Sequence, residues 1–171
     1  MEILLRPWTM ADATSLQQLC NAVNRRYLSD SLPKNYTIFD AKWWLNRVVK
    51  GDGKDGLWRA IVVDGQLIGS ISLERKSGNF RIDSELGLML LDEYSNRGIA
   101  TFAVGQICRE AFATLDIHRI TACVFSPNEA SQRVLLKNDF RLEGTLHAAA
   151  IKDGNIYDVC IYGSVKCYVE T

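Results

Sequence analysis

Apolar residues recur every three or four positions in two stretches of the first fifty residues, which is the spacing of an amphipathic helix. Before each stretch a threonine is followed three residues later by an aspartate, Thr9 with Asp12 and Thr37 with Asp40, as at many helix starts. A short strand-like run at residues 3–6, which ends at Pro7, precedes both. We therefore expect one strand and then two helices. Their expected buried faces are Leu16, Leu19, Cys20 and Val23 in the first helix and Ala41, Trp44, Leu45 and Val48 in the second.

Strand-like runs dominate the middle of the chain. Residues 57–63 and 66–74 flank Asp64-Gly65, a strong two-residue hairpin signal, and residues 80–90 form a third run. Residues 98–115 are apolar over a broad helical face, which predicts a long helix packed against a sheet. The remaining expected elements are a strand at 118–125, a helix at 127–138 and two strands at 141–151 and 156–169.

This order of elements, β-α-α-β-β-β-α-β-α-β-β, predicts the fold class. We expect an α/β (α+β) fold, with a mixed central sheet of about seven strands, helices on both faces and right-handed crossovers. The 171 residues, 47% of them apolar, suit a single domain over residues 1–171 with its own core.

Charge and hydropathy exclude several classes of protein. The 20 Lys and Arg residues balance the 20 Asp and Glu residues, whereas a protein that coats nucleic acid normally carries a basic excess. No apolar run approaches the roughly 20 residues that span a bilayer, and the first residues lack the plan of a signal peptide. We therefore expect a cytoplasmic protein that binds neither nucleic acid nor membranes, and a homodimer stays open.

The cysteine pattern predicts neither disulfides nor a metal site. The five cysteines are an odd number without a Cys-x-x-Cys pair, as in a reducing compartment. The two histidines, His118 and His147, show no metal-ligand spacing with them. Since most of the cysteines lie in apolar runs, we interpret them as small buried residues and expect no bound metal.

The most informative segment runs from Glu85 to Thr101. An apolar strand at residues 85–90 leads into the turn Ser95-Asn96-Arg97-Gly98, which opens the long helix. Such a turn leaves backbone N–H groups unpaired at the positive end of the helix dipole, where an anion can bind. Arg97 could add a charged donor. The segment matches neither the Walker nor the dinucleotide pattern, and an ordinary strand–helix turn is the alternative.

A second segment lies on the next expected helix, where Pro127-Asn128-Glu129-Ala130-Ser131 precedes Lys137-Asn138-Asp139-Phe140. Taken alone, Asn128 fits a helix cap and Ser131 an ordinary first-turn serine. Together with the Ser-x-x-Gly-x-Ala turn at residues 95–100, these segments make the chain resemble the GNAT superfamily of N-acetyltransferases. Among its branches the chain is most similar to the RimJ/RimL type, which acetylates the N-terminal amino group of ribosomal proteins.

The resemblance implies a role for each matching position. The turn would grip the pyrophosphate of acetyl-CoA, the backbone of the strand end would hold the pantetheine arm and the thioester carbonyl, and Asn128 would bond the pantetheine. Ser131 would protonate the departing thiolate, because the tyrosine that many family members use falls at Leu135 here. Ser95 also departs from the family's usual Gln or Arg. The implied acetyl-CoA contacts are Leu88, Met89, Leu90, Ser95, Asn96, Arg97, Gly98, Ile99, Ala100, Thr101 and Asn128.

The implied activity is acetyl transfer from acetyl-CoA to a primary amine by direct attack on the thioester. A peptide α-amino group, with a pKa of about 8, needs only a modest base, whereas a lysine-type amine at about 10.4 needs a stronger one. Glu85 is the first candidate base and His147 the second, with an ordinary solvated strand residue as the alternative for each.

Two segments are placed to select the acceptor, the loop and helix start at residues 24–44 and the last hairpin at residues 148–157. Only Asp30 and Asp40 are acidic in the first segment, which disfavours a polycation and favours a peptide N-terminus. The alternatives are a small amine (polyamine, aminoglycoside or amino acid) and a non-catalytic acyl-CoA sensor. Candidate pocket residues are Arg25, Arg26, Tyr27, Tyr36 and Trp43.

Overall fold

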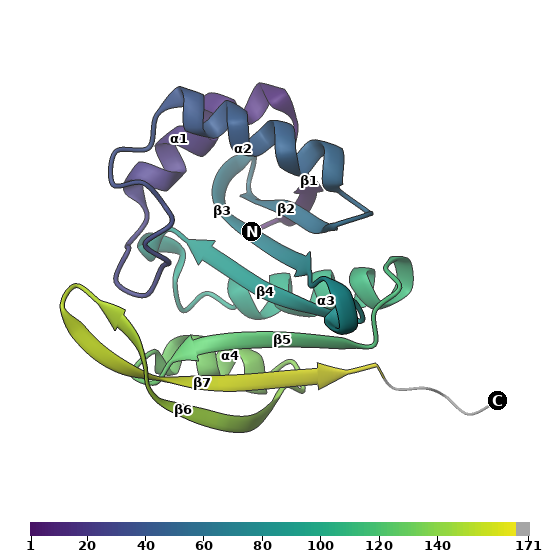
Figure 1. The fold of residues 1–171 in the computed structure, drawn as a ribbon. Coiled ribbons are helices and arrows are strands. Elements are labelled where there is room, and N and C mark those ends of the chain that lie inside the picture. Colours follow the sequence, from purple (N-terminus) through teal and green to yellow (C-terminus); the bar gives the residue numbers. More distant parts are fainter. Residues whose placement is uncertain (167–171) are drawn as a thin grey trace.

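A seven-stranded sheet separates two pairs of helices in the computed structural model, which describes residues 1–166 (Figure 1). The strand order is β1-β2-β3-β4-β5-β7-β6, and every neighbouring pair is antiparallel except β4 with β5. The strands are β1 (Ile3–Pro7), β2 (Gly56–Val63), β3 (Gln66–Arg75), β4 (Asp83–Leu90), β5 (Arg119–Phe125), β6 (Arg141–Lys152) and β7 (Asn155–Val165). The helices are α1 (Ala13–Ala22), α2 (Ile38–Gly51), α3 (Ile99–Thr114) and α4 (Glu129–Leu136), with 3-10 turns η1 (Met10–Asp12), η2 (Gly78–Phe80) and η3 (Asp92–Tyr94).

The expected element order and fold class are confirmed, but several element ends differ from the prediction. The strand expected at 80–90 starts only at Asp83, because Gly78–Phe80 form η2. The helix expected at 127–138 is α4, which Asn128 caps. Of the last expected strand, β7 reaches Val165; residues 167–169, and with them Cys167, lie outside the described residues. No helix in the described part of the chain is both long and apolar enough to cross a membrane.

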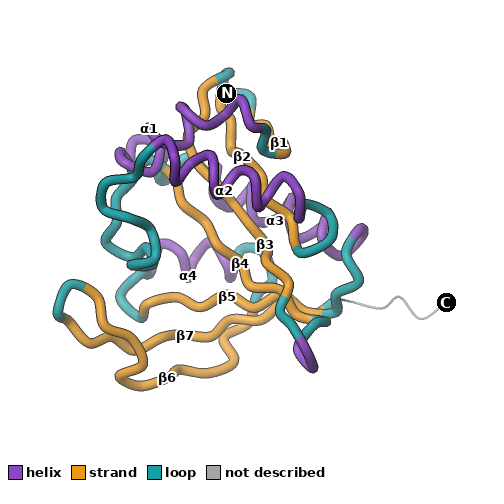
Figure 2. The backbone as a smooth tube through the Cα atoms, turned by 45° about the horizontal axis from the view of Figure 1, so that its top comes forward, coloured by secondary structure: helices purple, strands orange, loops and turns teal. Residues whose placement is uncertain are grey.

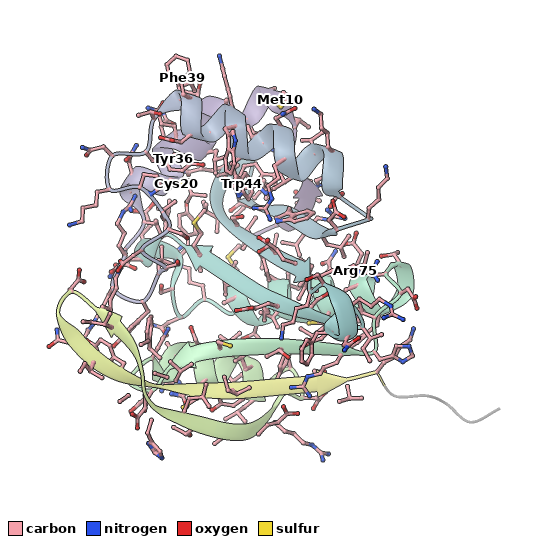
Figure 3. All side chains as sticks on the ribbon, in the orientation of Figure 1. Met10, Cys20, Tyr36, Phe39, Trp44 and Arg75 are labelled. Carbon is pink, nitrogen blue, oxygen red and sulfur yellow. The ribbon has the colours of Figure 1, made fainter. Side chains whose placement is uncertain are left out.

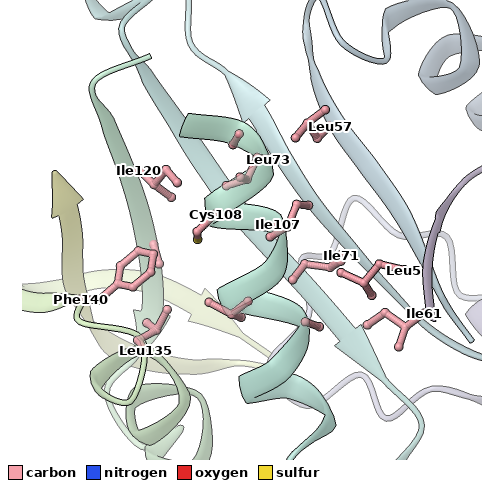
Figure 4. Packing of buried hydrophobic residues seen from close by; sticks show 14 of the residues in the cluster. Leu5, Leu57, Ile61, Ile71, Leu73, Ile107, Cys108, Ile120, Leu135 and Phe140 are labelled. Atoms are coloured by element: carbon pink, nitrogen blue, oxygen red, sulfur yellow. The ribbon is translucent and has the colours of Figure 1, made fainter. Parts of the chain in front are cut away.

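Side-chain alternation along the central strands forms a core on each face of the sheet. On one face, Ile61 and Ile71 pack with Ile107 of α3 (Figure 4). On the other, Trp58 of β2 packs with Leu16 of α1 and Leu45 of α2. The tube view shows α1 and α2 on the same side of the sheet, above β2 and β3 (Figure 2). The two helix pairs therefore cover opposite faces.

The starts of the two N-terminal helical segments follow from the Thr and Asp pairs in the sequence. Thr37 and Asp40 form a reciprocal capping box, in which Asp40 Oδ2 accepts the Thr37 N–H at 2.8 Å and Thr37 Oγ1 accepts the Asp40 N–H at 3.2 Å. Asp12 accepts the Thr9 N–H in the same way, and both of its oxygens also accept from Arg6. The local sequence thus fixes where the chain turns into each helix.

Strands β4 and β5 pair only at their amino ends and then separate (Figure 1). The three parallel pairs run from Asp83 with Arg119 to Glu85 with Thr121. The buried Asp83 carboxylate closes this end: it accepts from Thr121 Oγ1 at 2.8 Å and from Lys76 Nζ at 2.6 Å. Beyond Glu85, the facing edges of the two strands lack a strand partner, which opens the sheet from within.

Candidate active site

A cavity of about 1110 Å³ occupies the place where β4 and β5 separate. Its walls include Leu88 and Ala122 from the sheet face covered by α3, and Met89 and Cys123 from the face covered by α1 and α2. The cavity therefore passes through the sheet. On one side it meets the start of α3, and on the other it lies below α2 and the loop between α1 and α2, where Figure 3 places Tyr36 and Trp44.

The turn before α3 presents a row of backbone donors to this cavity. Asn96 and Gly98 both have left-handed backbone angles, with φ values of 58° and 78°. The Ser95 N–H is bonded to the Asp92 carbonyl, and the Phe102 N–H to the Gly98 carbonyl. Between them, the six consecutive N–H groups of residues 96–101 have no hydrogen-bond partner within residues 1–166. Together with the positive end of the α3 dipole, they form a site for an anion.

Positive side chains stand near this row, but they are not the ones expected from the sequence. Arg97 lies outside the cavity wall, and its guanidinium stacks over the Tyr94 ring at 5.3 Å. Arg133 and Lys137 of α4 and its C-cap do line the cavity. Neither was expected as a ligand contact from the sequence, although their spacing of four residues places both on one face of a helix. They would add attraction for a phosphorylated ligand.

The open edge of β4 offers backbone groups to a ligand. The Leu91 N–H donates to the Ile68 carbonyl of β3 at 3.0 Å. Because backbone groups alternate along a strand, Met89 also faces β3, and the N–H and carbonyl groups of Leu88 and Leu90 face the opening toward β5. The three expected contacts on this strand, Leu88, Met89 and Leu90, all line the cavity. Within the described residues, Leu88 and Leu90 also direct unpaired backbone N–H and carbonyl groups toward it.

Asn128 and Ser131 meet at the start of α4 and both line the cavity. Asn128 Oδ1 accepts the Ser131 N–H at 3.3 Å, so Asn128 does cap the helix. Its side-chain amide NH₂ and the Ser131 hydroxyl have no hydrogen-bond partner in the described part of the chain. The cap orients the asparagine so that a donor and a hydroxyl remain available to a ligand.

The two candidate bases lie outside the wall of the cavity. Glu85 is exposed on β4, opposite Glu74 of β3, and it is Glu74 that lines the cavity. His147 is 82% exposed on β6, and its Nδ1 bonds Asp158 at 2.9 Å. Asp158 also accepts the Ala148 N–H at 2.8 Å, so it anchors the bulge in β6 between Leu146 and Ala150. The Ala148 N–H, and then His147, lower the pKa of Asp158.

The acceptor side of the cavity is bounded by the loop after α1 and by the β6–β7 hairpin. Tyr27 of the loop contacts Phe125 with ring centroids 6.1 Å apart, and Phe125 contacts Tyr157 of β7 at 5.5 Å. The side chain of Lys152, at the hairpin, is buried and forms an ion pair with Asp30 of the loop. The two segments expected to select the acceptor are thus in direct contact.

Most of the residues expected to contact the acceptor line the cavity, and one of them stabilises the loop instead. Arg26, Tyr27, Tyr36 and Trp43 line the cavity, as expected. Arg25 does not; its guanidinium donates to the backbone carbonyls of Cys20 and Leu32 and braces the loop from within. Among residues 1–166, no three His, Cys, Asp or Glu side chains form a group that could hold a metal ion.

Several wall residues on the acceptor side had no signal in the sequence analysis. Cys123 of β5 is one of them; it is exposed, so the interpretation of the cysteines as buried residues is wrong for this one. Partial desolvation, followed by the charge of Glu85, raises the pKa of its thiol. The others lie on β3, where alternation places them together on the face toward α2. These are Ser70, Ser72 and Glu74.

Comparison with known proteins found one matching family model and several proteins of similar sequence. A family model described as an acetyltransferase (GNAT) domain matches residues 2–141. The uncharacterized N-acetyltransferase YoaA of Bacillus subtilis is 35% identical over 101 residues, which are 59% of this chain and 56% of YoaA. The chain therefore spans little more than half the length of that relative. The L-amino acid N-acetyltransferase AaaT of Escherichia coli is 22% identical over 173 residues, 96% of this chain and 99% of AaaT.

A solved structure with the same architecture is that of RimL, the ribosomal L7/L12 α-N-protein acetyltransferase, in complex with coenzyme A. It aligns with a TM-score of 0.85 and 19% sequence identity, over 95% of this chain and 93% of RimL. At that identity the likeness concerns the fold, and it agrees with the mixed sheet expected from the element order.

Proposed function

This chain belongs to the acetyltransferase (GNAT) family, and from that premise we propose that it transfers an acetyl group from acetyl-CoA to a primary amine. The observation that carries the proposal is the row of six unpartnered N–H groups at residues 96–101, at the start of a sixteen-residue helix. This is a site for a diphosphate, and acetyl-CoA joins a diphosphate to a thioester through an extended arm.

The residues around the cavity fit acetyl-CoA as a substrate. Arg133 and Lys137 supply positive charge on the side of the N–H row, for further phosphate groups. The backbone edges of Leu88 and Leu90 match the amides of the pantetheine arm, which would add to the sheet like a short strand. The Asn128 amide is a further donor along this path. The thioester would then lie between β4 and β5, near the middle of the sheet.

The chemistry requires alignment rather than a strong catalyst, because a thioester is already activated. The protein holds the carbonyl against a backbone N–H of β4, which stabilises the negative charge that develops on the oxygen. The amine enters from the α2 side and attacks directly, without an acetyl-enzyme. Ser131 donates a proton to the departing sulfur. The amine loses its proton to water. Glu85, the candidate base, lies outside the cavity wall and about 13 Å along β4 from Met89, so it would receive that proton only through a chain of water molecules.

For the acceptor we propose the α-amino group of a peptide N-terminus. At neutral pH such an amine is partly uncharged, which suits a site whose candidate base is a water-separated carboxylate. RimL, which shares the fold, is by its name a protein acetyltransferase, and this supports the RimJ/RimL-like assignment. The second candidate is a small amine, supported by the name of AaaT, an L-amino acid N-acetyltransferase that matches 96% of this chain.

Calorimetry and an acceptor panel test the proposal. Titration with acetyl-CoA should release heat, and coenzyme A release should depend on added amine, with the product and acetylation site read by mass spectrometry. Ser131→Ala should lower kcat about tenfold or more with little change in melting temperature. Ser77→Ala, an exposed serine at η2 outside the cavity, is the matched control. Absence of heat refutes the site, and binding without amine-dependent release indicates an acyl-CoA sensor instead.

A further inference from the structure

Strand β3 carries a polar track along the acceptor side of the cavity. Ser70, Ser72 and Glu74 lie on the same face of the strand and all line the cavity. In the sheet register they stand opposite Met89, Gly87 and Glu85 of β4, in that order. The track therefore starts beside the strand end proposed to hold the thioester and runs about 13 Å away from it, at about 3.3 Å per residue.

The first residue of the track offers a hydroxyl to the cavity. Ser70 is 7% exposed, lies in a central strand and opens to the cavity, and its hydroxyl has no hydrogen-bond partner within residues 1–166. Ser72, which is half-buried, likewise has no partner for its hydroxyl there. Both oxygens are open to the cavity, unlike the Ser84 hydroxyl, which is fully buried without a partner among the described residues. A polar ligand in this part of the cavity therefore finds two free hydroxyls to bond.

The far end of the track carries an incompletely neutralised pair of carboxylates. Glu74 and Glu85 are directly opposite on neighbouring strands, which places their Cβ atoms about 5 Å apart. Arg47 of α2 pairs with Glu74 at 2.6 Å, whereas Glu85 has no ion-pair partner in the described residues. Two other cations at this end of the sheet, Lys76 and Arg119, form ion pairs with Asp83 and Glu143. One negative charge is therefore left over here.

The space between the two ends suits an extended chain. Gly87 leaves the floor open, since a Cβ there would come within 3.0 Å of the Ser72 hydroxyl. Trp43 and Trp44 of α2 form part of the same wall and offer aromatic faces to an alkyl or peptide backbone. Polar side chains on β3 and the tryptophans of α2 line the same cavity. This arrangement favours an acceptor that extends along β3 over a compact one.

We propose that the track binds an acceptor with two positive groups: the reacting amine lies beside Ser70, and a second cation lies against Glu74, where the neighbouring Glu85 carboxylate adds negative charge. This inference rests on the proposed function and names the acceptor class within it. For a peptide, the second cation would be a basic side chain near the N-terminus; for a small molecule, it would be the distal group of a long amine. The Arg47 pair, 50% and 43% exposed, is weak enough for the incoming cation to displace.

Matched acceptors test the proposal on the full chain with acetyl-CoA. The peptide arm compares Ala-Ala-Arg-Ala with Ala-Ala-Gln-Ala, and the small-molecule arm compares ω-aminoalkylguanidines of increasing length with n-alkylamines. A guanidinium is not acetylated, so each acceptor has one reactive nitrogen. The KM should be about tenfold lower for the guanidinium-bearing member of at least one arm, and that arm identifies the source of the cation. Equal KM values in both arms overturn the proposal.

Two variants assign the preference to the track. Glu74→Gln should raise the KM of the guanidinium-bearing acceptor about tenfold and leave the KM of its neutral partner and of acetyl-CoA unchanged. The glutamine keeps an oxygen for the indole Nε1–H of Trp58. Arg47→Gln should lower that same KM, because it frees Glu74. A preference that survives Glu74→Gln, or is lost with Arg47→Gln, overturns the proposal; if Glu74→Gln does not fold, Arg47→Gln alone decides. Failure of every amine to react would instead refute the proposed function.

Discussion

Gly98 offers a way to disturb the anion site without touching a side chain. It is the N-cap of α3 and has φ 78°, in the left-handed region that residues with a Cβ rarely adopt. A Cβ built on Gly98 meets no atom within 4 Å. The cost of Gly98→Ala is therefore one of backbone conformation alone, about 1 kcal/mol. In a chain of this size, that lowers the melting temperature by about 2–4 °C.

Gly65 is a matched control for this change. It lies in the hairpin between β2 and β3, away from the cavity, with φ 83° and no atom within 4 Å of a built Cβ. Gly65→Ala should therefore destabilise the protein by a similar amount, about 1 kcal/mol. Only Gly98→Ala should also shift the N–H row at residues 96–101. Losing one charge-assisted hydrogen bond of about 1.5–3 kcal/mol weakens acetyl-CoA binding about tenfold or more.

The assay is a thermal melt of both variants together with titration calorimetry against acetyl-CoA. We expect similar melting temperatures and a dissociation constant that rises only for Gly98→Ala. Equal dissociation constants in the wild type and both variants would show that the turn before α3 does not hold the diphosphate. A Gly98→Ala variant as stable as the wild type would refute the assignment of strain to the left-handed backbone.

Three further changes test other parts of the structure. Lys152→Met removes the charge that ties the hairpin to Asp30, and it should raise the KM for the acceptor several-fold while calorimetry shows unchanged acetyl-CoA binding. Arg59→Ala leaves Asp52 and Glu110 without their buried partner and should lower the free energy of unfolding in urea by about 3 kcal/mol. The Arg6 guanidinium lowers the pKa of Asp12, so the Asp12 carboxylate stabilises the fold above about pH 4 and loses that effect as the pH falls further. In melts recorded at several pH values, Asp12→Asn should make the melting temperature depend less on pH in this acidic range.

Much of the fold could be predicted because its signals are local. The Thr37–Asp40 capping box, the Asp64-Gly65 hairpin and the broad apolar face of α3 each depend on residues within one or two turns of each other. Element ends were less predictable. The strand expected from Phe80 begins only at Asp83, because Gly78 has φ 60° and the 3-10 turn that starts there includes Phe80.

In the candidate site, too, the residues that lie close together in the sequence could be predicted, and those on neighbouring strands could not. The turn at residues 95–101 is contiguous, and its N–H row follows from the start of a helix, so the sequence analysis could identify it. Asn128 and Ser131 are three residues apart on α4 and were found in the same way. Glu85 was chosen as a base for its strand, yet only the register shows that Glu74, one strand away, reaches the cavity wall.

By itself, the sequence determined the order of the elements, their caps and turns, and the row of donors before α3, since each follows from periodicity or from hydrogen bonds between near neighbours. Only the tertiary structure decided which face of β3 is wall and which is core, because alternation along a strand produces two faces and cannot say what covers either. On that face Ser70 is buried, whereas Ser72 and Glu74 are only partly covered. Ser70, Ser72 and Glu74 therefore line a cavity that opens because β4 and β5 pair over only three residues.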